Sequence, residues 1–569
     1  MIRFSVCALA LAALAAPLHA NEQSVAYFTS GKTGEVPVLL SAEEQGYYGS
    51  LFEAIEADNW TRVENLLVQR EEGPLHSAAL AAYYLDPGSP AIPLPQLESW
   101  LDRYADAPRA GEILRLAQTR GTLREWRLPS EHQMVRQRGL TRRTLPARVN
   151  DGSLPQDMQD AILERIRNDD PDGARILLDG IDSALSAETR AEWRQRVAWS
   201  YYIENRDAEA LAMARTVAEG SGVWVGEGEW IVGLAAWRLG DCRIAANGFE
   251  RAAAIGASRP DTAAAAHYWA SRALVRCREP EKAGDHLRQA ARFTETLYGM
   301  LAREQLGQPM PDDHARPDVT RDDWQRLQRA SGAREAVMLS SIGQDALADA
   351  TLIHLVQTGN RELYQPAARL ARALGLTGAQ RYMAYNAPRG ESAPSWLRWP
   401  VTDQQPVGGW RVDPALAFAH ALQESDFREA VVSPAGAIGL MQITPITRRE
   451  FAGSINMSTS ADLTQPNTNL AFGQRTLEGY ASGDYTSGQL PKVMAAYNAG
   501  PTPVSRWRTE IRDQGDPLTW MESIPYWETR SYVNIVMRNY WMYLRQAAAP
   551  APSRSELAQN RWPQFPRER

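Results

Sequence analysis

The 569-residue sequence has few lysines and few cysteines, and it contains a single long hydrophobic run. Lysine accounts for three of the 61 basic residues, and the formal net charge is −7. An acidic chain is a poor partner for nucleic acid, whose phosphates require a basic surface, so we expect no nucleic-acid partner. Beyond the N-terminus no run reaches the ~18 apolar residues that a membrane-spanning helix needs, so no membrane span is expected.

The one hydrophobic run lies at the N-terminus. Arg3 is followed by apolar residues from Phe4 to Leu14 and by small residues up to Ala20. This pattern is typical of a secretory signal peptide, here residues 1–20. Cleavage after Ala20 gives an exported protein, for which we expect a periplasmic location.

The mature chain keeps two cysteines, Cys242 and Cys277. An oxidising compartment permits a disulfide, and both residues lie near turns of adjacent helical units, so we expect them to be joined. Closing that loop would stabilise the fold by on the order of 4 kcal/mol in the chain-entropy model. Two buried free thiols are the alternative. Two cysteines without a nearby histidine cluster supply too few metal ligands, and neither a metal nor a cofactor is expected.

Most of the chain has helical periodicity. Residues 41 to about 310 are rich in Ala, Leu, Arg and Glu, with Pro, Gly and short polar clusters at helix-length intervals. Weak repeats with a period of about 34 residues predict stacked helical hairpins, an α-solenoid. A second helical block runs from about Arg321 to Tyr385 and ends in the linker Ala387–Ser395. The tail after Ala547 is rich in Ala, Pro and Arg, and we expect it to be disordered.

The stretch from Asp413 to Pro445 predicts a buried helix that ends in a carboxylate. Asp413 is a suitable N-cap, and Pro414 fits the first helical position. Apolar and small residues occupy nearly all faces up to Leu422, which indicates burial. Glu424 follows at the C-terminal end, where poor solvation and the helix dipole both raise the pKa of a carboxyl group. A Glu protonated near neutral pH can act as a general acid, whereas the alternative is a Glu that caps the helix or faces water.

The loop after this helix is rich in glycine and in neutral polar groups. Gly436 and Gly439 let the backbone approach a ligand closely. Ser433, Gln442 and Thr444 add hydrogen-bonding groups without charge, which suit a sugar better than a phosphate or a metal.

A second catalytic carboxylate is not evident, although most glycosidases use two. Asp426 follows the candidate acid by two residues, a spacing that does not place the two on one helix face. Glu522 and Glu528 come later in the chain. Arg530 lies close to Glu528, which favours a structural ion pair there.

Three ordered segments resemble the soluble lytic murein transglycosylases. They are ESDFREAVVSPAGAIGLMQITP (Glu424–Pro445), AAYNAGP (Ala495–Pro501) and ESIPYWETRSYV (Glu522–Val533). The resemblance implies a mainly all-α protein with a ring-forming α-solenoid over residues 21–316 and a small helical linker domain over 317–395. It also implies a lysozyme-like catalytic domain over 396–550, followed by a tail over 551–569.

The same resemblance implies an activity and a set of site residues. The family cleaves the β-1,4 bond between N-acetylmuramic acid and N-acetylglucosamine in peptidoglycan and leaves 1,6-anhydromuramoyl ends. Glu424 would be the single catalytic acid and base. The positions that match substrate-binding residues of the family are Ser433, Met441, Gln442, Tyr497, Asn498 and Tyr532. The expected partner is the peptidoglycan glycan strand, and we expect a monomer.

Two other functions remain open from the sequence. A true hydrolase, as in goose-type lysozymes, would need a water-activating carboxylate. A helical scaffold that binds glycan or proteins would need no chemistry, although the intact Glu424 and GLMQ segment argue against it.

Overall fold

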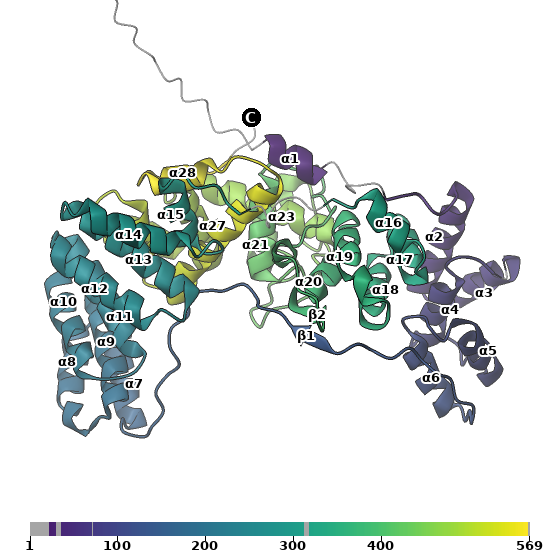
Figure 1. Ribbon diagram of the computed structural model, residues 1–569, viewed down its shortest axis with the longest axis horizontal. Helices are drawn as coiled ribbons and strands as arrows, with labels where there is room; N and C mark the ends of the chain where they lie inside the picture. Colours follow the sequence, from purple (N-terminus) through teal and green to yellow (C-terminus); the bar gives the residue numbers. More distant parts are fainter. Residues whose placement is uncertain (1–21, 30–35, 71, 312–317, 567–569) are drawn as a thin grey trace, which may run out of the picture.

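The computed structural model describes residues 22–29, 36–70, 72–311 and 318–566. Over these residues the chain forms 28 α-helices and two short strands (Figure 1). The all-α class predicted from the sequence is confirmed. The predicted signal peptide at residues 1–20 lies outside the described residues. None of the described helices is long and apolar enough to cross a membrane.

Two helical blocks that are far apart in the sequence share one hydrophobic core, on the right of Figure 1. Trp100 from the first block and Tyr364 from the second are among its fully buried residues. The first block consists of α2 (Ala42–Glu56), α3 (Trp60–Gln69), α4 (His76–Leu85), α5 (Leu94–Tyr104) and α6 (Ala110–Thr119). The second consists of α16 (Arg321–Leu327), α17 (Ser331–Ser341), α18 (Asp345–Thr358), α19 (Tyr364–Ala373) and α20 (Thr377–Tyr385).

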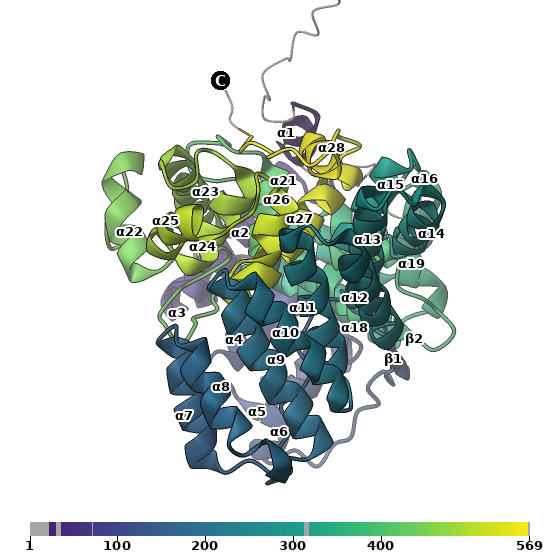
Figure 2. The same ribbon diagram turned by 90° about the vertical axis from the view of Figure 1, so that its left-hand side faces the viewer.

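The solenoid comprises residues 156–305, the later part of the range predicted for it, and it lies on the opposite side of the molecule, facing the viewer in Figure 2. Its successive helices pack as hairpins because alanine and glycine let their axes approach closely. A Cβ atom at Gly248, for example, would lie 2.7 Å from the backbone nitrogen of Gly233 on the neighbouring helix. The helices are α7 (Gln156–Arg167), α8 (Pro171–Asp179), α9 (Ala187–Ile203), α10 (Asp207–Thr216), α11 (Trp224–Leu239), α12 (Cys242–Ile255), α13 (Pro260–Arg276), α14 (Pro280–Ala291) and α15 (Leu297–Gln305).

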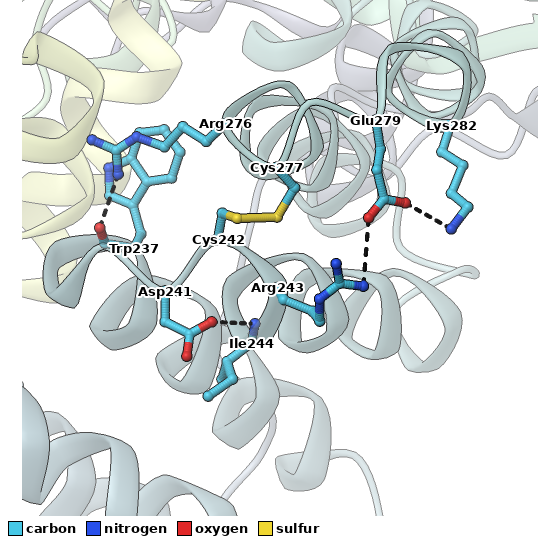
Figure 3. Close-up of a disulfide and its surroundings, with 9 residues drawn as sticks. All are labelled: Trp237, Asp241, Cys242, Arg243, Ile244, Arg276, Cys277, Glu279 and Lys282. Atoms are coloured by element: carbon cyan, nitrogen blue, oxygen red, sulfur yellow. Dashed lines mark hydrogen bonds and ion pairs between the residues drawn. A yellow bond between two sulfur atoms is a disulfide. The ribbon is translucent and has the colours of Figure 1, made fainter.

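A disulfide joins Cys242, the first residue of α12, to Cys277, which follows α13 (Figure 3). Their Cα atoms lie 5.5 Å apart. Asp241 caps α12 by accepting a hydrogen bond from the Ile244 backbone at 3.0 Å. The bridge therefore links the helix ends of two neighbouring hairpins.

An extended segment, residues 122–154, leads from the first helical block to the solenoid. On the way β1 (Met134–Arg136) pairs antiparallel with β2 (Asn386–Pro388), with Met134 opposite Pro388. The N-terminal helices therefore do not run directly into the solenoid. The domain boundaries expected from the sequence stay a prediction.

The C-terminal region lies between these two sides, in the centre of Figure 1. It shares a single hydrophobic core with the solenoid, and its longest helix is buried along most of its length. Its helices are α21 (Pro414–Glu424), α22 (Pro445–Phe451), α23 (Pro466–Ser482), α24 (Leu490–Ala499), α25 (Pro501–Glu510), α26 (Pro517–Glu522), α27 (Trp527–Gln546) and α28 (Pro552–Ala558).

The N-terminal helix α1 (Glu22–Thr29) packs on this central region. The ring of Phe28 meets Phe418 of α21 edge-on, with centroids 5.1 Å apart. Ser24 donates a hydrogen bond to Asp413 at 2.5 Å. The start of the described chain is thus attached to the helix that carries the candidate acid.

The expected disorder of the tail is wrong for its described part. Helix α28 forms there, and Leu557 and Phe565 are buried. The backbone N–H of Phe565 donates to the Gly488 carbonyl at 2.7 Å. A few apolar residues, rather than the Ala, Pro and Arg that dominate the composition, decide the packing of this segment.

Candidate active site

Helix α21 is buried from Pro414 to Leu422, as its composition predicts. Asp413 caps it by accepting a hydrogen bond from the Ala415 backbone at 2.9 Å, and the same carboxylate accepts one from Tyr540 at 2.9 Å. These two hydrogen bonds fix the position of the N-terminal end of α21. Glu424 is the last residue of α21 and is partly exposed.

Among the described residues the Glu424 carboxyl has one hydrogen-bond partner, the hydroxyl of Tyr532, which donates to Oε1 at 2.7 Å. The pKa of Glu424 is raised to about 7, mainly by burial, while the Tyr532 hydrogen bond lowers it and the negative charge of Glu528 adds to the rise. No arginine, lysine or histidine forms an ion pair with Glu424 within the described ranges. A carboxyl in this setting holds a proton near neutral pH and is able to give it up.

His420 lies one helical turn before Glu424 and is fully buried. Its Nδ1 is 2.7 Å from the Tyr532 hydroxyl, and its ring lies 4.6 Å from that of Tyr497. Burial lowers the pKa of His420 to about 3, so the ring is neutral. The sequence analysis missed this residue. Its spacing of four from Glu424 on a buried helix was the available signal.

The glycine-rich loop is held against the end of α21. Ser425 donates to the Leu440 carbonyl at 2.8 Å. Gly439 has φ +78°, and a Cβ atom there would lie 2.4 Å from the Leu463 carbonyl oxygen. Only glycine fits this position, because the conformation and the space both exclude a side chain.

Asn469 of α23, which the sequence analysis also missed, holds the other side of the loop. It accepts from the Met441 backbone at 2.8 Å and donates to the Ile438 carbonyl at 2.8 Å. The residue is fully buried. A single amide therefore satisfies both a donor and an acceptor of the loop.

The aromatic residues predicted from the sequence lie around Glu424. Tyr532 contacts it directly, and Tyr497 packs on His420 while donating to the Met441 carbonyl at 2.7 Å. The Met441 side chain is buried, so in this structure it supports the loop and does not line an open surface.

The other predicted positions lie farther along the loop and on α24. Ser433 accepts from the Ala437 backbone at 3.0 Å. Gln442 is partly exposed and donates to the Gly439 carbonyl at 2.9 Å. Asn498 accepts from Thr529 at 2.6 Å and so joins α24 to α27.

The ion pair suggested for Arg530 and Glu528 is not found in the described part of the chain. Arg530 instead donates to the Glu522 backbone carbonyl at 3.4 Å and lies over the ring of Trp199. Glu522 pairs with Arg143 of the extended segment at 3.2 Å. The sequence order could not reveal this pair, because the two residues are 379 positions apart.

Residues 404–518 match the family model described as "Transglycosylase SLT domain". This region is a transglycosylase SLT domain. The SLT domain contains Glu424, the glycine-rich loop and the AAYNAGP segment, so the resemblance drawn from those motifs is confirmed.

Two curated proteins are similar to part of the chain. One is the soluble lytic murein transglycosylase of Escherichia coli K12, with 34% identity over 150 residues, or 26% of this chain and 23% of that protein. The other is an endo-type membrane-bound lytic murein transglycosylase A of Klebsiella pneumoniae, with 31% identity over 105 residues, or 17% of this chain and 50% of that protein. The aligned part thus spans about a quarter of the first relative and half of the second.

The fold as a whole is similar to that of a solved structure, the 70 kDa soluble lytic transglycosylase of Escherichia coli. The superposition has a TM-score of 0.53 at 18% identity and covers 92% of this chain and 100% of that one. The helical arrangement outside the SLT domain is therefore shared, although little of its sequence is.

Proposed function

We propose that this protein is a lytic transglycosylase that cleaves the β-1,4 bond between N-acetylmuramic acid and N-acetylglucosamine in peptidoglycan. The observation that carries the proposal is the setting of Glu424: a partly exposed carboxyl whose pKa is raised to about 7, bound by a tyrosine and, in the part of the chain that the structure describes, without a paired cation. The SLT domain around it and the murein transglycosylases to which it is similar support the substrate class.

In the proposed reaction Glu424 acts first as acid and then as base. Its proton passes to the glycosidic oxygen as the bond from C1 of the muramoyl sugar to that oxygen breaks. The 2-acetamido group of the same sugar stabilises the cationic carbon. The Glu424 carboxylate then takes the proton of the sugar's 6-hydroxyl, and O6 bonds to C1. The proton is back on Glu424, a 1,6-anhydro ring has formed, and no water has been consumed.

The nucleophile is part of the substrate, which explains how one carboxyl is sufficient. Glu528 is the other carboxylate whose charge acts on Glu424, but no hydrogen bond joins the two among the described residues. Ser433, Gln442, Tyr497, Asn498 and Tyr532 stay proposed substrate-binding positions.

Product analysis tests the reaction. Purified sacculi are digested in water enriched in oxygen-18, and the released muropeptides are analysed by mass spectrometry. We expect anhydro ends that are lighter by one water than hydrolysis products and that carry no heavy oxygen. Incorporation of oxygen-18 at the new ends would instead identify a hydrolase, and no release at all would identify a glycan-binding scaffold.

Further proposals concern the whole chain. We propose that it acts in the periplasm as a monomer, with residues 396–550 as catalytic domain, 317–395 as linker domain and 21–316 as helical ring. Light scattering tests the monomer, and cell fractionation tests the location. In exported protein, non-reducing mass spectrometry should recover Cys242 and Cys277 in one linked peptide, as their bond in the structure suggests.

A further inference from the structure

We propose that His420 is a positioning residue, which donates its Nδ1–H to the Tyr532 hydroxyl and thereby keeps that hydroxyl directed at Oε1 of Glu424. Oε2 of Glu424 is then the oxygen that exchanges a proton with the substrate. The inference rests on the proposed function of Glu424 and adds a tautomer and a direction to its hydrogen bonds.

The direction follows first from the ionised state of Glu424. A carboxylate only accepts hydrogen bonds, so the 2.7 Å contact between Oε1 and the Tyr532 oxygen requires the tyrosine proton. Burial and the nearby Glu424 raise the pKa of Tyr532 well above 10, so the phenol carries that one proton and no other. The second 2.7 Å contact of the same oxygen must therefore be donated by His420. A neutral ring does this only with its proton on Nδ1.

The protonated state of Glu424 has two possible arrangements. In the first, Tyr532 still donates to Oε1, and the acid proton is on Oε2. In the second, the acid proton is on Oε1 and is donated to Tyr532, which in turn donates to His420. The second arrangement directs the acid proton into the protein, away from any substrate, and it requires the other histidine tautomer.

The surroundings of His420 oppose a change of tautomer. That change moves the ring proton from Nδ1 to Nε2, and Nε2 is buried with no hydrogen-bond partner among the described residues. Among the described residues the other titratable group that faces the ring is Tyr497, whose hydroxyl donates to the Met441 carbonyl. Glu424 itself meets Tyr532, Tyr497 and the charge of Glu528. The ring therefore keeps its Nδ1 proton through the cycle, and Tyr532 keeps its direction.

Nitrogen-15 NMR on the full-length protein tests the tautomer directly. The protein contains eight histidines, and labelling them selectively while comparing wild type with His420→Asn assigns the His420 signals. At neutral pH we expect a protonated Nδ1 and an unprotonated Nε2. A protonated Nε2, or a charged ring, would overturn the proposal. This measurement requires no cleavage, so it stands apart from failure of the proposed activity.

The pH dependence of cleavage tests the role. In His420→Leu the Tyr532 hydroxyl loses its orientation, and its bond stabilises the Glu424 carboxylate less. We expect kcat on soluble glycan strands to fall about fivefold, with the alkaline limb of the pH profile shifted up by roughly half a unit. His420→Asn places an amide N–H where Nδ1 lies. Compared with His420→Leu, it should restore most of kcat and most of the wild-type position of the alkaline limb.

The sign of the shift in the alkaline limb shows which residue, His420 or Tyr532, donates the hydrogen bond between them. If Tyr532 instead donated to His420, removing the ring would free the hydroxyl for Glu424, and the alkaline limb would move down. An unmoved limb in His420→Leu, or equal behaviour of the Leu and Asn variants, would also overturn the proposal. Phe418→Leu, which loosens the packing of the same helix without touching these hydrogen bonds, controls for a general loss of order and should leave the limb unmoved.

Discussion

Glu424 and Glu522 each accept a hydrogen bond from a tyrosine, yet their surroundings differ. Tyr532 donates to Glu424 at 2.7 Å, and Tyr298 donates to Glu522 at 2.6 Å. Glu522 also pairs with Arg143 at 3.2 Å, whereas the described parts of the chain place no cation against Glu424. A buried tyrosine contact is therefore no sign of function by itself. A paired cation favours the charged form of a carboxyl, whereas a poorly solvated carboxyl without one can hold a proton near neutral pH.

Glu522 and Glu424 also differ in where they lie in the fold. The Glu522 side chain is 0% exposed and lies where the extended segment and the solenoid meet the C-terminal region. Arg143 also pairs with Glu227 of α11 at 3.2 Å, so one guanidinium joins the two regions. Glu424 ends a helix and stays partly open, as a group that meets a polymer must. The first site holds the molecule together, and the second is available for chemistry.

The largest expected effect contrasts Glu424→Gln with Glu522→Gln. The first amide can neither donate the proton nor take it back, so cleavage of sacculi should fall at least about 100-fold, with an unchanged melting temperature. The second should lower the melting temperature, because Arg143 loses one of its two paired charges, and leave the products unchanged where the protein is folded. Muropeptide release and thermal unfolding, measured on both variants, test the contrast.

A result from either variant could contradict the different roles assigned to Glu424 and Glu522. Residual cleavage by Glu424→Gln above about one per cent of wild type would point to another acid. A folded Glu522→Gln protein that had lost cleavage to the same degree would place Glu522 in the chemistry.

The second prediction concerns Arg143. Replacing it with Met leaves Glu522 and Glu227 buried without their shared cation, and we expect the free energy of unfolding to fall by about 3 kcal/mol. Arg243→Met is the matched control, because its side chain is 76% exposed and its pair with Glu279 spans 3.6 Å. That change should cost less than about 1 kcal/mol. Equal effects in urea unfolding would show that the buried pair does not hold the regions together.

The two sites also differ in how far the sequence predicts them. Glu424 stands at the end of a helix whose capping and apolar pattern are local, so its burial and raised pKa could be expected from neighbouring residues alone. The partners are not local. Tyr532 is 112 residues from His420, and Arg143 is 379 residues from Glu522. Helical periodicity says which face of a helix is buried but not which helix covers it.

The same limit applies to predicting the fold from the sequence. Helix positions and the all-α class follow from periodicity and from Pro and Gly punctuation. The shared core of residues 40–117 and 319–397 does not, because nothing local records that pairing. The prediction of a disordered tail is wrong for a related reason, because overall composition averages over the few apolar residues, such as Leu557, that decide packing.

The third prediction sharpens the difference between the two tyrosines. Tyr532→Phe removes a donor that favours the charged form of Glu424, so the pKa of Glu424 should rise above about 7. The alkaline limb of the pH profile for kcat/KM then moves to higher pH, and the plateau rate falls about tenfold, since the carboxylate formed on proton donation is less stable. Tyr298→Phe should leave the pH profile in place and reduce thermal stability only. A downward shift in Tyr532→Phe would contradict the assigned direction of the bond.

The smallest expected effect is that of Glu528→Gln. The Glu528 side chain is exposed, and its negative charge raises the pKa of Glu424. Removing that charge should lower the pKa of Glu424, which moves the alkaline limb down by a few tenths of a pH unit at low ionic strength. Solvent and salt screen an exposed charge, so the shift should shrink in 0.5 M salt, about three times the physiological ionic strength.

Glu528→Gln also tests the hydrolase alternative, which needs a second, water-activating carboxylate. If it activated a water molecule, Glu528→Gln would lower the rate by at least about 100-fold and would do so at every ionic strength. A small, salt-dependent shift of the limb, with anhydro products retained, fits a charge that tunes a single acid. Glu510→Gln, at the end of α25 and paired with Arg506, supplies the matched control and should leave the pH profile unchanged. The two outcomes differ in the size of the effect, in its salt dependence and in the product. Glu528→Gln therefore decides whether the reaction uses one catalytic carboxylate or two, although its expected effect is the smallest.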